Sequence, residues 1–280
     1  MKITFVICLH STRIENLKQT IRLLEKKEPN LIGSELIINF HDFYDEDLIS
    51  SVFNIKKNNL NLEIYNKPFM CNYGVNKASN EIVCILDSDR ILPYNYFYQL
   101  VFNMKENDFI TTKFIKECVK DETDEDLING NFICNLEERS VENKINHKSL
   151  FSGNVVFFKK NYIAIGGMDE TFIGYSFNDN DITQKVMSNK NLNCIFLNQY
   201  EIHLYHEKNF YFKSRCFTKE EKELHCVTNM LKFCNKWNIE INERYKEAKE
   251  YLVIANDMQN KFIRDRFYDE YNKIKFNLFV

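Results

Sequence analysis

Short apolar runs alternate with segments of helical periodicity in the first third of the chain, and this alternation constrains the fold more than any other feature. Residues 3–9, 36–40 and 82–86 are almost wholly apolar, as expected of strands buried on both faces. Between the first two runs, apolar residues recur at the spacing of one helix face, at Ile14, Leu17, Ile21 and Leu24. Strands that alternate with helices predict an α/β fold with a mainly parallel central sheet flanked by helices.

Polar residues follow the ends of these apolar runs. His10 comes after the first run, Asp42 shortly after the second and Asp87 after the third. In open α/β sheets, ligands bind beyond the carboxyl ends of the strands. We therefore expect His10, Asp42 and Asp87 to lie together at a ligand-binding edge of the sheet.

The rest of the chain carries weaker signals. We expect a helix over residues 45–57, a strand over 62–65, a helix over 75–79, strands over 154–159 and 192–197, and a helix that begins near Asp179. Residues 106–149 mix charges and include an acidic run at 121–126, which we interpret as an insertion or mobile loop with a solvated face. We expect one domain over residues 1–212, followed by a helical C-terminal extension over 213–280.

Composition and charge exclude several classes of protein. The net charge of -3 gives no bulk attraction to nucleic acid or to anionic lipid. The nine cysteines are scattered, odd in number and without a CxxC pair, which favours reduced thiols over a disulfide framework. The first apolar run follows Met1 and Lys2 directly, and no apolar run approaches the ~20 residues of a membrane-spanning helix. We expect a cytoplasmic protein that associates with a membrane at most peripherally. The basic and aromatic tail at 261–280 is the candidate for such a contact, although its pattern favours a packed helix.

Asp87-Ser88-Asp89 ends the third apolar run and is a candidate metal site. One residue between the two aspartates lets both carboxylates approach one divalent cation, and Mg²⁺ and Mn²⁺ prefer such oxygen ligands. A metal at this point would neutralise the charge that builds on a departing diphosphate. The simpler alternative is a turn, which Asp and Ser also favour.

A second acidic cluster ends the stretch FSGNVVFFKKNYIAIGGMDETFIGYSFNDND, residues 151–181. Asp179 stands at the expected start of a helix, where the helix dipole and free N–H groups keep a carboxylate ionised. Such a carboxylate can act as a general base toward an attacking hydroxyl group. It can also be no more than a helix cap, and Asp181 is the second candidate for either role.

Two histidines, His203 and His206, follow the strand expected at 192–197. Imidazole nitrogens join carboxylates in mixed sites for Mn²⁺-like metals. A lone histidine after a strand is more often structural, so position alone does not decide between the two interpretations.

The segment CNYGVNKASNEIVCILDSD, residues 71–89, resembles the stretch before the DxD motif in family 2 glycosyltransferases of the GT-A fold. There an Arg-Asn-x-Gly pattern and an Ala precede an apolar strand that ends in Asp-x-Asp. The matching positions are Asn72, Gly74, Ala78, Asp87 and Asp89. Cys71 stands where the family has an Arg that contacts the nucleotide, and Lys67 is the candidate to replace it.

Residues 151–182 resemble a segment of galactosyltransferase-type enzymes and of the chondroitin-polymerase-like bacterial transferases. The matching positions are Gly153, Gly166, Gly167, Asp169, Glu170, Phe172, Gly174 and Asp179. At four consecutive positions the family has Trp, two small residues and Glu. This sequence has Tyr175, Ser176, Phe177 and Asn178 there. The resemblance implies that Asp179 is the catalytic base, and it assigns acceptor contacts to Gly153, Gly167, Tyr175 and Asn178.

The same resemblance implies which residues bind the donor and the metal. Asp87, Asp89 and His206 would hold Mn²⁺ or Mg²⁺, with His203 as the second candidate histidine. Contacts to a nucleotide-sugar fall to His10, Arg13, Asp42, Asn72, Asp87 and Ser88. Residues 1–105 would then form the nucleotide-sugar-binding half of the domain, and residues 150–212 its acceptor and catalytic half.

These implications describe a metal-dependent, inverting glycosyltransferase. It would move a hexose or N-acetylhexosamine from a UDP-sugar to a saccharide or lipid-linked saccharide, in bacterial surface polysaccharide synthesis at the inner face of the plasma membrane. One alternative is a nucleotidyltransferase acting on sugar phosphates, which needs a glycine-rich loop that HSTRIEN, residues 10–16, does not provide. The other is a non-catalytic glycan-binding protein of glycosyltransferase origin, which Cys71 and Asn178 favour and the retained aspartates oppose.

Overall fold

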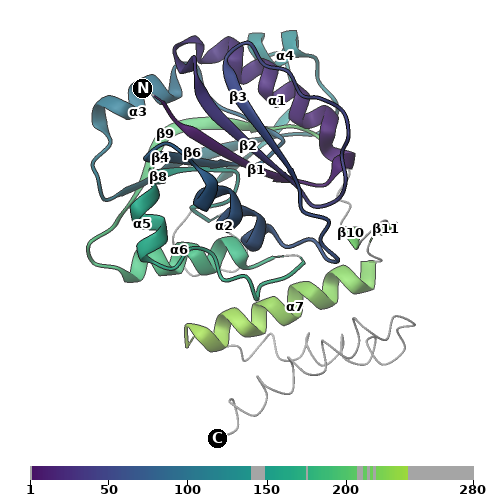
Figure 1. The fold of residues 1–280 in the computed structure, drawn as a ribbon, viewed down its shortest axis with the longest axis vertical. Coiled ribbons are helices and arrows are strands. Elements are labelled where there is room, and N and C mark those ends of the chain that lie inside the picture. Colours follow the sequence, from purple (N-terminus) through teal and green to yellow (C-terminus); the bar gives the residue numbers. More distant parts are fainter. Residues whose placement is uncertain are drawn as a thin grey trace, which may run out of the picture.

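A computed structural model describes residues 2–139, 149–174, 176–206, 211–212, 215–216 and 219–238 (Figure 1). Its centre is a sheet of nine strands in the order β3-β2-β1-β4-β8-β6-β9-β5, with β7 also paired to β6. The strands are β1 (Thr4–Leu9), β2 (Ser34–Phe40), β3 (Phe53–Asn59), β4 (Ile82–Leu86), β5 (Arg90–Ile91), β6 (Asp108–Cys118), β7 (Cys134–Glu138), β8 (Asn154–Phe158) and β9 (Asn193–His203). The helices are α1 (Ile14–Lys27), α2 (Lys67–Lys77), α3 (Tyr96–Asn103), α4 (Asp124–Asn129), α5 (Lys159–Ala164), α6 (Asn178–Ser188) and α7 (Lys219–Lys236). A separate pair is formed by β10 (Tyr211–Phe212) and β11 (Arg215–Cys216).

Six of the nine strands run in the same direction. β1 pairs in parallel with β2 and β4, β2 pairs in parallel with β3, and β6 with β9. β8 lies antiparallel between β4 and β6, so that β6 points the same way as β4. The carboxyl ends of β1, β2, β4, β6 and β9 therefore meet at one edge, where α/β sheets bind ligands. The predicted α/β fold with a mainly parallel sheet is confirmed, with β5, β7 and β8 as its antiparallel members.

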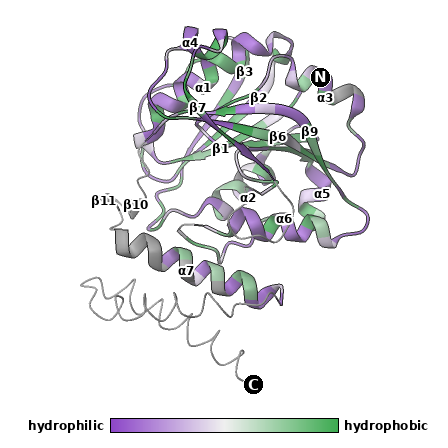
Figure 2. Ribbon diagram, turned by 180° about the vertical axis from the view of Figure 1, so that it is seen from behind, coloured by the Kyte–Doolittle hydropathy of each residue, from purple (hydrophilic) through white to green (hydrophobic). Residues whose placement is uncertain are grey.

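Two apolar cores cover the two faces of the sheet. Alternate residues of β1 enter different cores, because successive side chains of a strand point to opposite faces. Phe5 and Ile7 pack on the face that α1 and α3 cover, whereas Val6 and Cys8 pack toward α2, α5 and α6. Hydrophobic residues accordingly gather on the central strands, while hydrophilic residues dominate β7 at the margin (Figure 2).

The expected insertion or mobile loop at residues 106–149 is wrong for its first part. β6 is a central strand of the sheet, paired with β8 on one side and β9 on the other. The sequence did not predict this strand because buried polar residues interrupt its apolar pattern. These residues form hydrogen bonds inside the protein: Thr111 donates to the Asn154 carbonyl at 2.6 Å, and Thr112 donates to Glu201 at 3.2 Å. The acidic run at 121–126 leads into α4, which begins with a capping box between Thr123 and Asp126. Residues 140–148 lie outside the described residues.

Three smaller expectations also differ from the structure. The helix expected at 45–57 is replaced by a loop and β3, an edge strand in which Lys56 forms an ion pair with Glu35 of β2. Residues 62–65 form a loop with one bridge residue. The helix expected at 75–79 begins earlier, at Lys67, because Asn66 caps it by accepting a hydrogen bond from the Phe69 N–H at 3.0 Å.

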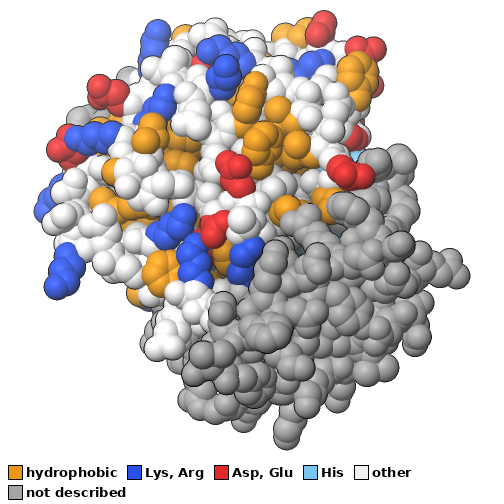
Figure 3. All heavy atoms as spheres, turned by 60° about the horizontal axis from the view of Figure 1, so that its bottom comes forward, with side chains coloured by type: hydrophobic (Ala, Val, Ile, Leu, Met, Phe, Trp, Pro, Cys, Tyr) orange, Lys and Arg blue, Asp and Glu red, His pale blue; other side chains and the backbone are white. Residues whose placement is uncertain are grey.

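The helix α7 lies along the side of the molecule that carries α6 (Figure 1). Seen from that side, basic and acidic side chains are interspersed on the surface (Figure 3), as 37 basic and 40 acidic residues predict. Among the described helices, none is both long and apolar enough to cross a membrane. Residues 239–280, which include most of the expected C-terminal extension and the basic tail, lie outside the described residues.

Candidate active site

The first predicted residues lie at the carboxyl ends of β1 and β2. The Nε2 atom of His10 is 3.3 Å from Oδ2 of Asp42. Asp42 also accepts two hydrogen bonds from Ser11, from its backbone N–H at 2.9 Å and from its hydroxyl at 2.5 Å. Arg13 ends the short 3-10 turn that follows, Ser11–Arg13. His10 and Asp42 are therefore neighbours at this edge, and their contact with a nucleotide stays a prediction.

Asp89 and two histidines form a compact set of possible metal ligands. The Nε2 atoms of His206 and His203 lie 3.0 Å and 3.7 Å from Asp89 Oδ2, and they are 3.1 Å from each other. The backbone joins the two segments, because Arg90 and His203 are partners between β5 and β9 and the Leu204 N–H donates to the Asp89 carbonyl at 2.9 Å. In the described part of the chain, these three residues place ligand atoms within 4.8 Å of one another. Both histidines therefore lie beside Asp89.

The groups around this set keep Asp89 ionised. Burial tends to raise the pKa of Asp89, but His203, His206 and Arg90 outweigh it and hold that pKa well below its ordinary value. Burial and Arg90 tend to lower the pKa of His203, whereas Asp89 and Glu117 raise it, and the net shift is upward. The Nδ1 atom of His203 is 3.3 Å from Glu117, which is the outer contact typical of a metal-binding imidazole. Two imidazole nitrogens and one carboxylate oxygen fit a Mn²⁺-like ion.

Asp87 lies beside this set and forms a contact of its own, and its predicted role as a metal ligand stays a prediction. Its Oδ1 atom lies 2.9 Å from Nζ of Lys67, the first residue of α2. The same ammonium group is 3.3 Å from Oδ1 of Asp179, so Lys67 bridges the two acidic regions of the site. Burial would lower the pKa of Lys67, but Asp179 and Asp87 reverse this and hold it well above its ordinary value. Lys67 therefore stays charged between two carboxylates.

The two candidate bases have different surroundings. Asp179 lies in the first turn of α6 beside Lys67, with 21% of its side chain exposed. Burial and the nearby Asp87 raise the pKa of Asp179, and Lys67 opposes that shift without cancelling it. Asp181 is fully buried and is held by Trp237 Nε1 at 2.8 Å and Lys236 Nζ at 2.9 Å. The contacts of Asp181 are thus structural, and Asp179 stays the predicted base.

Asn72 supports the glycine turn and has no free hydrogen-bonding position for a nucleotide. Its amide donates to the Met168 carbonyl at 2.9 Å and to Glu170 at 2.8 Å, and its oxygen accepts from Tyr162 and from the Met168 N–H at 2.7 Å and 3.0 Å. A Cβ on Gly167 would lie 2.5 Å from that oxygen. Asn72 therefore has a structural role in this turn, and its contact with a nucleotide stays a prediction, while Gly167 is required for close packing.

Gly153 packs against a buried group of charges at the end of β8. A Cβ at this position would lie 2.2 Å from Glu201 Oε1 and 2.8 Å from an Arg139 nitrogen, and its φ of +109° also favours glycine. Glu201 forms ion pairs with Arg90 at 3.3 Å and Arg139 at 2.5 Å, and all three side chains are buried. The Gly153 carbonyl accepts from the Asp87 N–H at 2.7 Å. Gly153 therefore positions Asp87, and its acceptor contact stays a prediction.

The remaining predicted residues lie in the turns next to these groups. Ser88 is 5% exposed, and its carbonyl accepts a hydrogen bond from the Thr20 hydroxyl at 2.9 Å. Asn178 is half-buried as the first residue of α6. Tyr175 lies outside the described residues.

Sequence reasoning missed two features of the site. It considered Lys67 only as a substitute for an arginine, whereas the position of Lys67 between Asp87 and Asp179 requires the fold of α2 against two distant segments. It did not identify the buried group of Arg90, Arg139 and Glu201, because nothing in the local pattern pairs charges that are far apart in sequence. The cap signal Asn66-Lys67-Pro68 was the one available clue to the start of α2.

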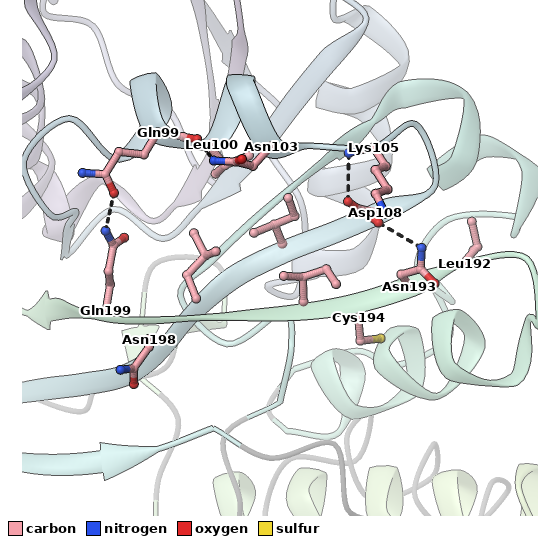
Figure 4. A pocket seen from close by; sticks show the side chains of 13 residues that line it. Gln99, Leu100, Asn103, Lys105, Asp108, Leu192, Asn193, Cys194, Asn198 and Gln199 are labelled. Atoms are coloured by element: carbon pink, nitrogen blue, oxygen red, sulfur yellow. Dashed lines mark hydrogen bonds between the residues drawn. The ribbon is translucent and has the colours of Figure 1, made fainter.

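A cavity of about 730 Å³ lies elsewhere, between α3 and β9 (Figure 4). Its polar lining residues bond to one another: Gln199 donates to Gln99 at 2.7 Å, and Asn193 donates to Asp108 at 3.0 Å. The cavity adjoins the amino ends of β6 and β9, whereas the acidic residues lie at the carboxyl ends of the same sheet. Its size does not make it the active site, because none of the groups described above line it.

Comparisons with known proteins agree with this arrangement. Residues 133–207 match the family model described as the N-terminal domain of galactosyltransferase. No curated protein matches the sequence. The crystal structure of GalNAc-T7 with UDP, GalNAc and Mn²⁺ is similar, with a TM-score of 0.57 and 12% identity over 97% of this chain and 54% of that one. The structure of S. aureus TarS 1-349 in complex with UDP-GlcNAc has a TM-score of 0.54 and 14% identity, over 90% of this chain and 72% of that one.

This chain spans about half the length of the GalNAc-T7 chain that it matches. The expected resemblance to galactosyltransferase-type proteins of the GT-A fold is confirmed, while the narrower resemblance to family 2 and chondroitin-polymerase-like transferases stays a prediction. The chain has the GT-A fold of nucleotide-sugar glycosyltransferases, and residues 133–207 carry its match to the galactosyltransferase family.

Proposed function

We propose that the protein is a metal-dependent, inverting glycosyltransferase. It moves a hexose or N-acetylhexosamine from a UDP-sugar to a saccharide hydroxyl in a single displacement. The galactosyltransferase match and the fold shared with two glycosyltransferase structures support the reaction class. Those two structures contain UDP or UDP-GlcNAc, which supports a UDP-sugar as the donor of this chain.

The observation that carries the proposal is the position of Lys67. Its ammonium group lies 2.9 Å from Asp87 and 3.3 Å from Asp179, which brings the acidic end of β4 next to the start of α6. A displacement with inversion needs a base on one side of the sugar carbon and a charge-stabilised leaving group on the other. Lys67 is therefore suited to contact the diphosphate when the donor binds, which would release Asp179 from the ion pair.

Asp179 is the residue that removes the proton from the acceptor hydroxyl. Its raised pKa, caused by burial and by Asp87, makes it a stronger base than an exposed aspartate once it is deprotonated. Asp89, His203 and His206 would hold the divalent metal, which supplies positive charge to the departing diphosphate when bound. His10 and Asp42 lie at the same edge of the sheet, where the nucleoside is expected.

The acceptor and the biological setting follow from the sequence resemblance. We propose a saccharide or lipid-linked saccharide as the acceptor, in bacterial surface polysaccharide synthesis on the cytoplasmic face of the membrane. Residues 1–105 would serve mainly the donor and residues 150–212 mainly the acceptor. The pairing of β4 with β8 would join the two halves inside one sheet.

The test is a panel of UDP-sugars with Mn²⁺, with UDP release measured in the presence of saccharide acceptors. Wild type is compared with Asp89→Ala, Asp179→Asn and the exposed control Asp47→Asn. We expect turnover in wild type and the control, and loss of turnover in both site variants. Equal turnover in all four proteins would refute the mechanism, and UDP binding without transfer to any acceptor would favour a non-catalytic glycan-binding protein.

A further inference from the structure

The turn that precedes Asp179 has an unusual backbone. Ser176 has a φ of +76° and Phe177 a φ of +64°, which is the left-handed region that non-glycine residues rarely adopt. Two consecutive residues of this kind persist only when surrounding contacts hold them in place. They fall at the two positions where the galactosyltransferase pattern has small residues.

One face of α7 supplies such contacts. His225, Asn229, Lys232, Phe233 and Lys236 recur every three or four residues and so share one side of the helix; we call them the clamp face. We call residues 169–174 and 176–177, which lead into α6, the base loop. The clamp face runs along the base loop over its whole described length.

The middle of the clamp face holds the turn directly. The Asn229 amide donates to the carbonyl of Ser176 at 3.1 Å and to that of Ile173 at 3.0 Å. The rings of Phe177 and Phe233 are 5.6 Å apart, and Phe177 is only 4% exposed. The large side chain at 177 is therefore packed against α7.

The ends of the clamp face fix the two sides of the loop. Lys236 lies 2.8 Å from Asp169 at the start of the loop and 2.9 Å from the buried Asp181 on α6. Hydrogen bonds from Lys236 and Thr171 outweigh burial and lower the pKa of Asp169, which keeps this ion pair charged. At the other end, a Cβ on Gly174 would lie 2.7 Å from the His225 ring, so helix and loop are in close contact there.

We propose that the clamp face of α7 positions the catalytic base by holding the left-handed turn at Ser176 and Phe177. The α7 residues act through this turn and do not touch the reacting groups. The proposal rests on the proposed function, because it assigns the base role to Asp179. It explains why this chain tolerates Ser and Phe where small residues are expected. Glycine adopts the left-handed conformation without strain, whereas Ser176 and Phe177 need the contacts with α7 to hold it.

The test combines Asn229→Ala with Ser176→Gly. Without the Asn229 hydrogen bonds, a serine at 176 tends to leave the left-handed region, whereas a glycine adopts it without strain. We expect Asn229→Ala to lower kcat about tenfold with the donor KM changed less than about twofold, since misplacement of a base costs mainly turnover. The double variant Ser176→Gly/Asn229→Ala should recover most of the lost kcat. The matched control on the exposed side of the same helix, Asn235→Ala, should equal wild type.

A second readout does not depend on turnover. The Asp181 N–H donates to the Phe177 carbonyl at 2.9 Å, so amide hydrogen exchange in residues 176–184 reports on the turn. Asn229→Ala should accelerate this exchange and leave residues 82–86 of β4 unchanged. Lys236→Ala should do the same, and Lys236→Arg should restore slow exchange by keeping the charge.

Each outcome bears on a different claim. Equal exchange and kcat in Asn229→Ala, Asn235→Ala and wild type would overturn the clamp. A loss of kcat that Ser176→Gly does not recover, or that comes with an equal loss of donor binding, would make α7 a merely structural support. A wild type that transfers no sugar would refute the proposed function, while hydrogen exchange would still decide whether α7 holds the turn.

Discussion

The two acidic regions of the site are held in place in different ways. Asp87 and Asp89 are fixed by the backbone of the sheet, through the Asp87 N–H to Gly153 at 2.7 Å and the Leu204 N–H to Asp89 at 2.9 Å. Asp179 follows a turn with two left-handed residues that side chains of α7 support. The metal side thus rests on sheet register, and the base side rests on side-chain contacts. Lys67 is the one described residue that forms ion pairs with both Asp87 and Asp179.

The largest expected effect separates the chemical roles of the two regions. Asp179→Asn removes the base but keeps the shape of the side chain, so kcat should fall by about 10²–10⁴-fold, the contribution typical of general base catalysis. The donor KM should change little because Asp179 does not hold the metal. Steady-state kinetics measure both values. A parallel rise in donor KM would place Asp179 in donor binding instead.

The next largest effect concerns the buried charges behind the metal side. Glu201→Gln leaves Arg90 and Arg139 without their buried carboxylate, which should lower the free energy of unfolding by about 3–5 kcal/mol. Urea unfolding measures it. Glu138→Gln makes the same change in an exposed pair with Lys113 and should cost less than about 1 kcal/mol. Similar losses in both variants would mean that the buried ion pairs stabilise the fold no more than the exposed pair does.

A smaller effect tests the composition of the metal set. His203→Ala removes one of three ligands and should raise the Mn²⁺ concentration needed for half-maximal activity at least about tenfold. Tyr205→Phe, at an exposed residue between the two histidines, is the control and should leave that concentration unchanged. If His203→Ala needs the same Mn²⁺ concentration as wild type, His203 is not a ligand and His206 is the histidine that binds the metal.

The smallest effect is a shift in pH dependence through Lys67. Only the ionised form of Asp179 can accept a proton, so kcat/KM should fall on the acid side as this group becomes protonated. Because burial and Asp87 raise its pKa, the fall should occur at a higher pH than an exposed aspartate would give. Lys67→Met removes the cation that opposes the shift, so the fall should move to still higher pH. The exposed control Lys190→Met should leave the pH profile of kcat/KM unchanged. An unchanged profile in Lys67→Met would show that Lys67 does not influence the pKa of Asp179.

The same contrast explains what the sequence could predict. β1, β2 and β4 were predictable because their residues are buried on both faces and therefore apolar, and Asp87 and Asp42 follow directly from where these strands end. β6 was not, because Thr111 and Thr112 are polar residues whose partners, Asn154 and Glu201, are distant in sequence.

In the site, too, local patterns were predictable and contacts between distant segments were not. Asp89, His206 and Asp179 could be selected as candidate site residues from motifs and their order along the chain. The placement of His203 beside Asp89, the contact of Asp87 with Lys67 and the anchoring of Asp181 all depend on contacts between segments that no local pattern encodes.

The most direct test of this division is calorimetric titration with UDP, with and without Mn²⁺, of wild type, Asp89→Ala and Asp179→Asn. We predict that Mn²⁺ strengthens UDP binding to wild type and to Asp179→Asn alike, and that Asp89→Ala loses this Mn²⁺-dependent gain. Retention of the gain in Asp89→Ala, or its loss in Asp179→Asn, would contradict a site in which the sheet edge binds the metal and α6 supplies the base.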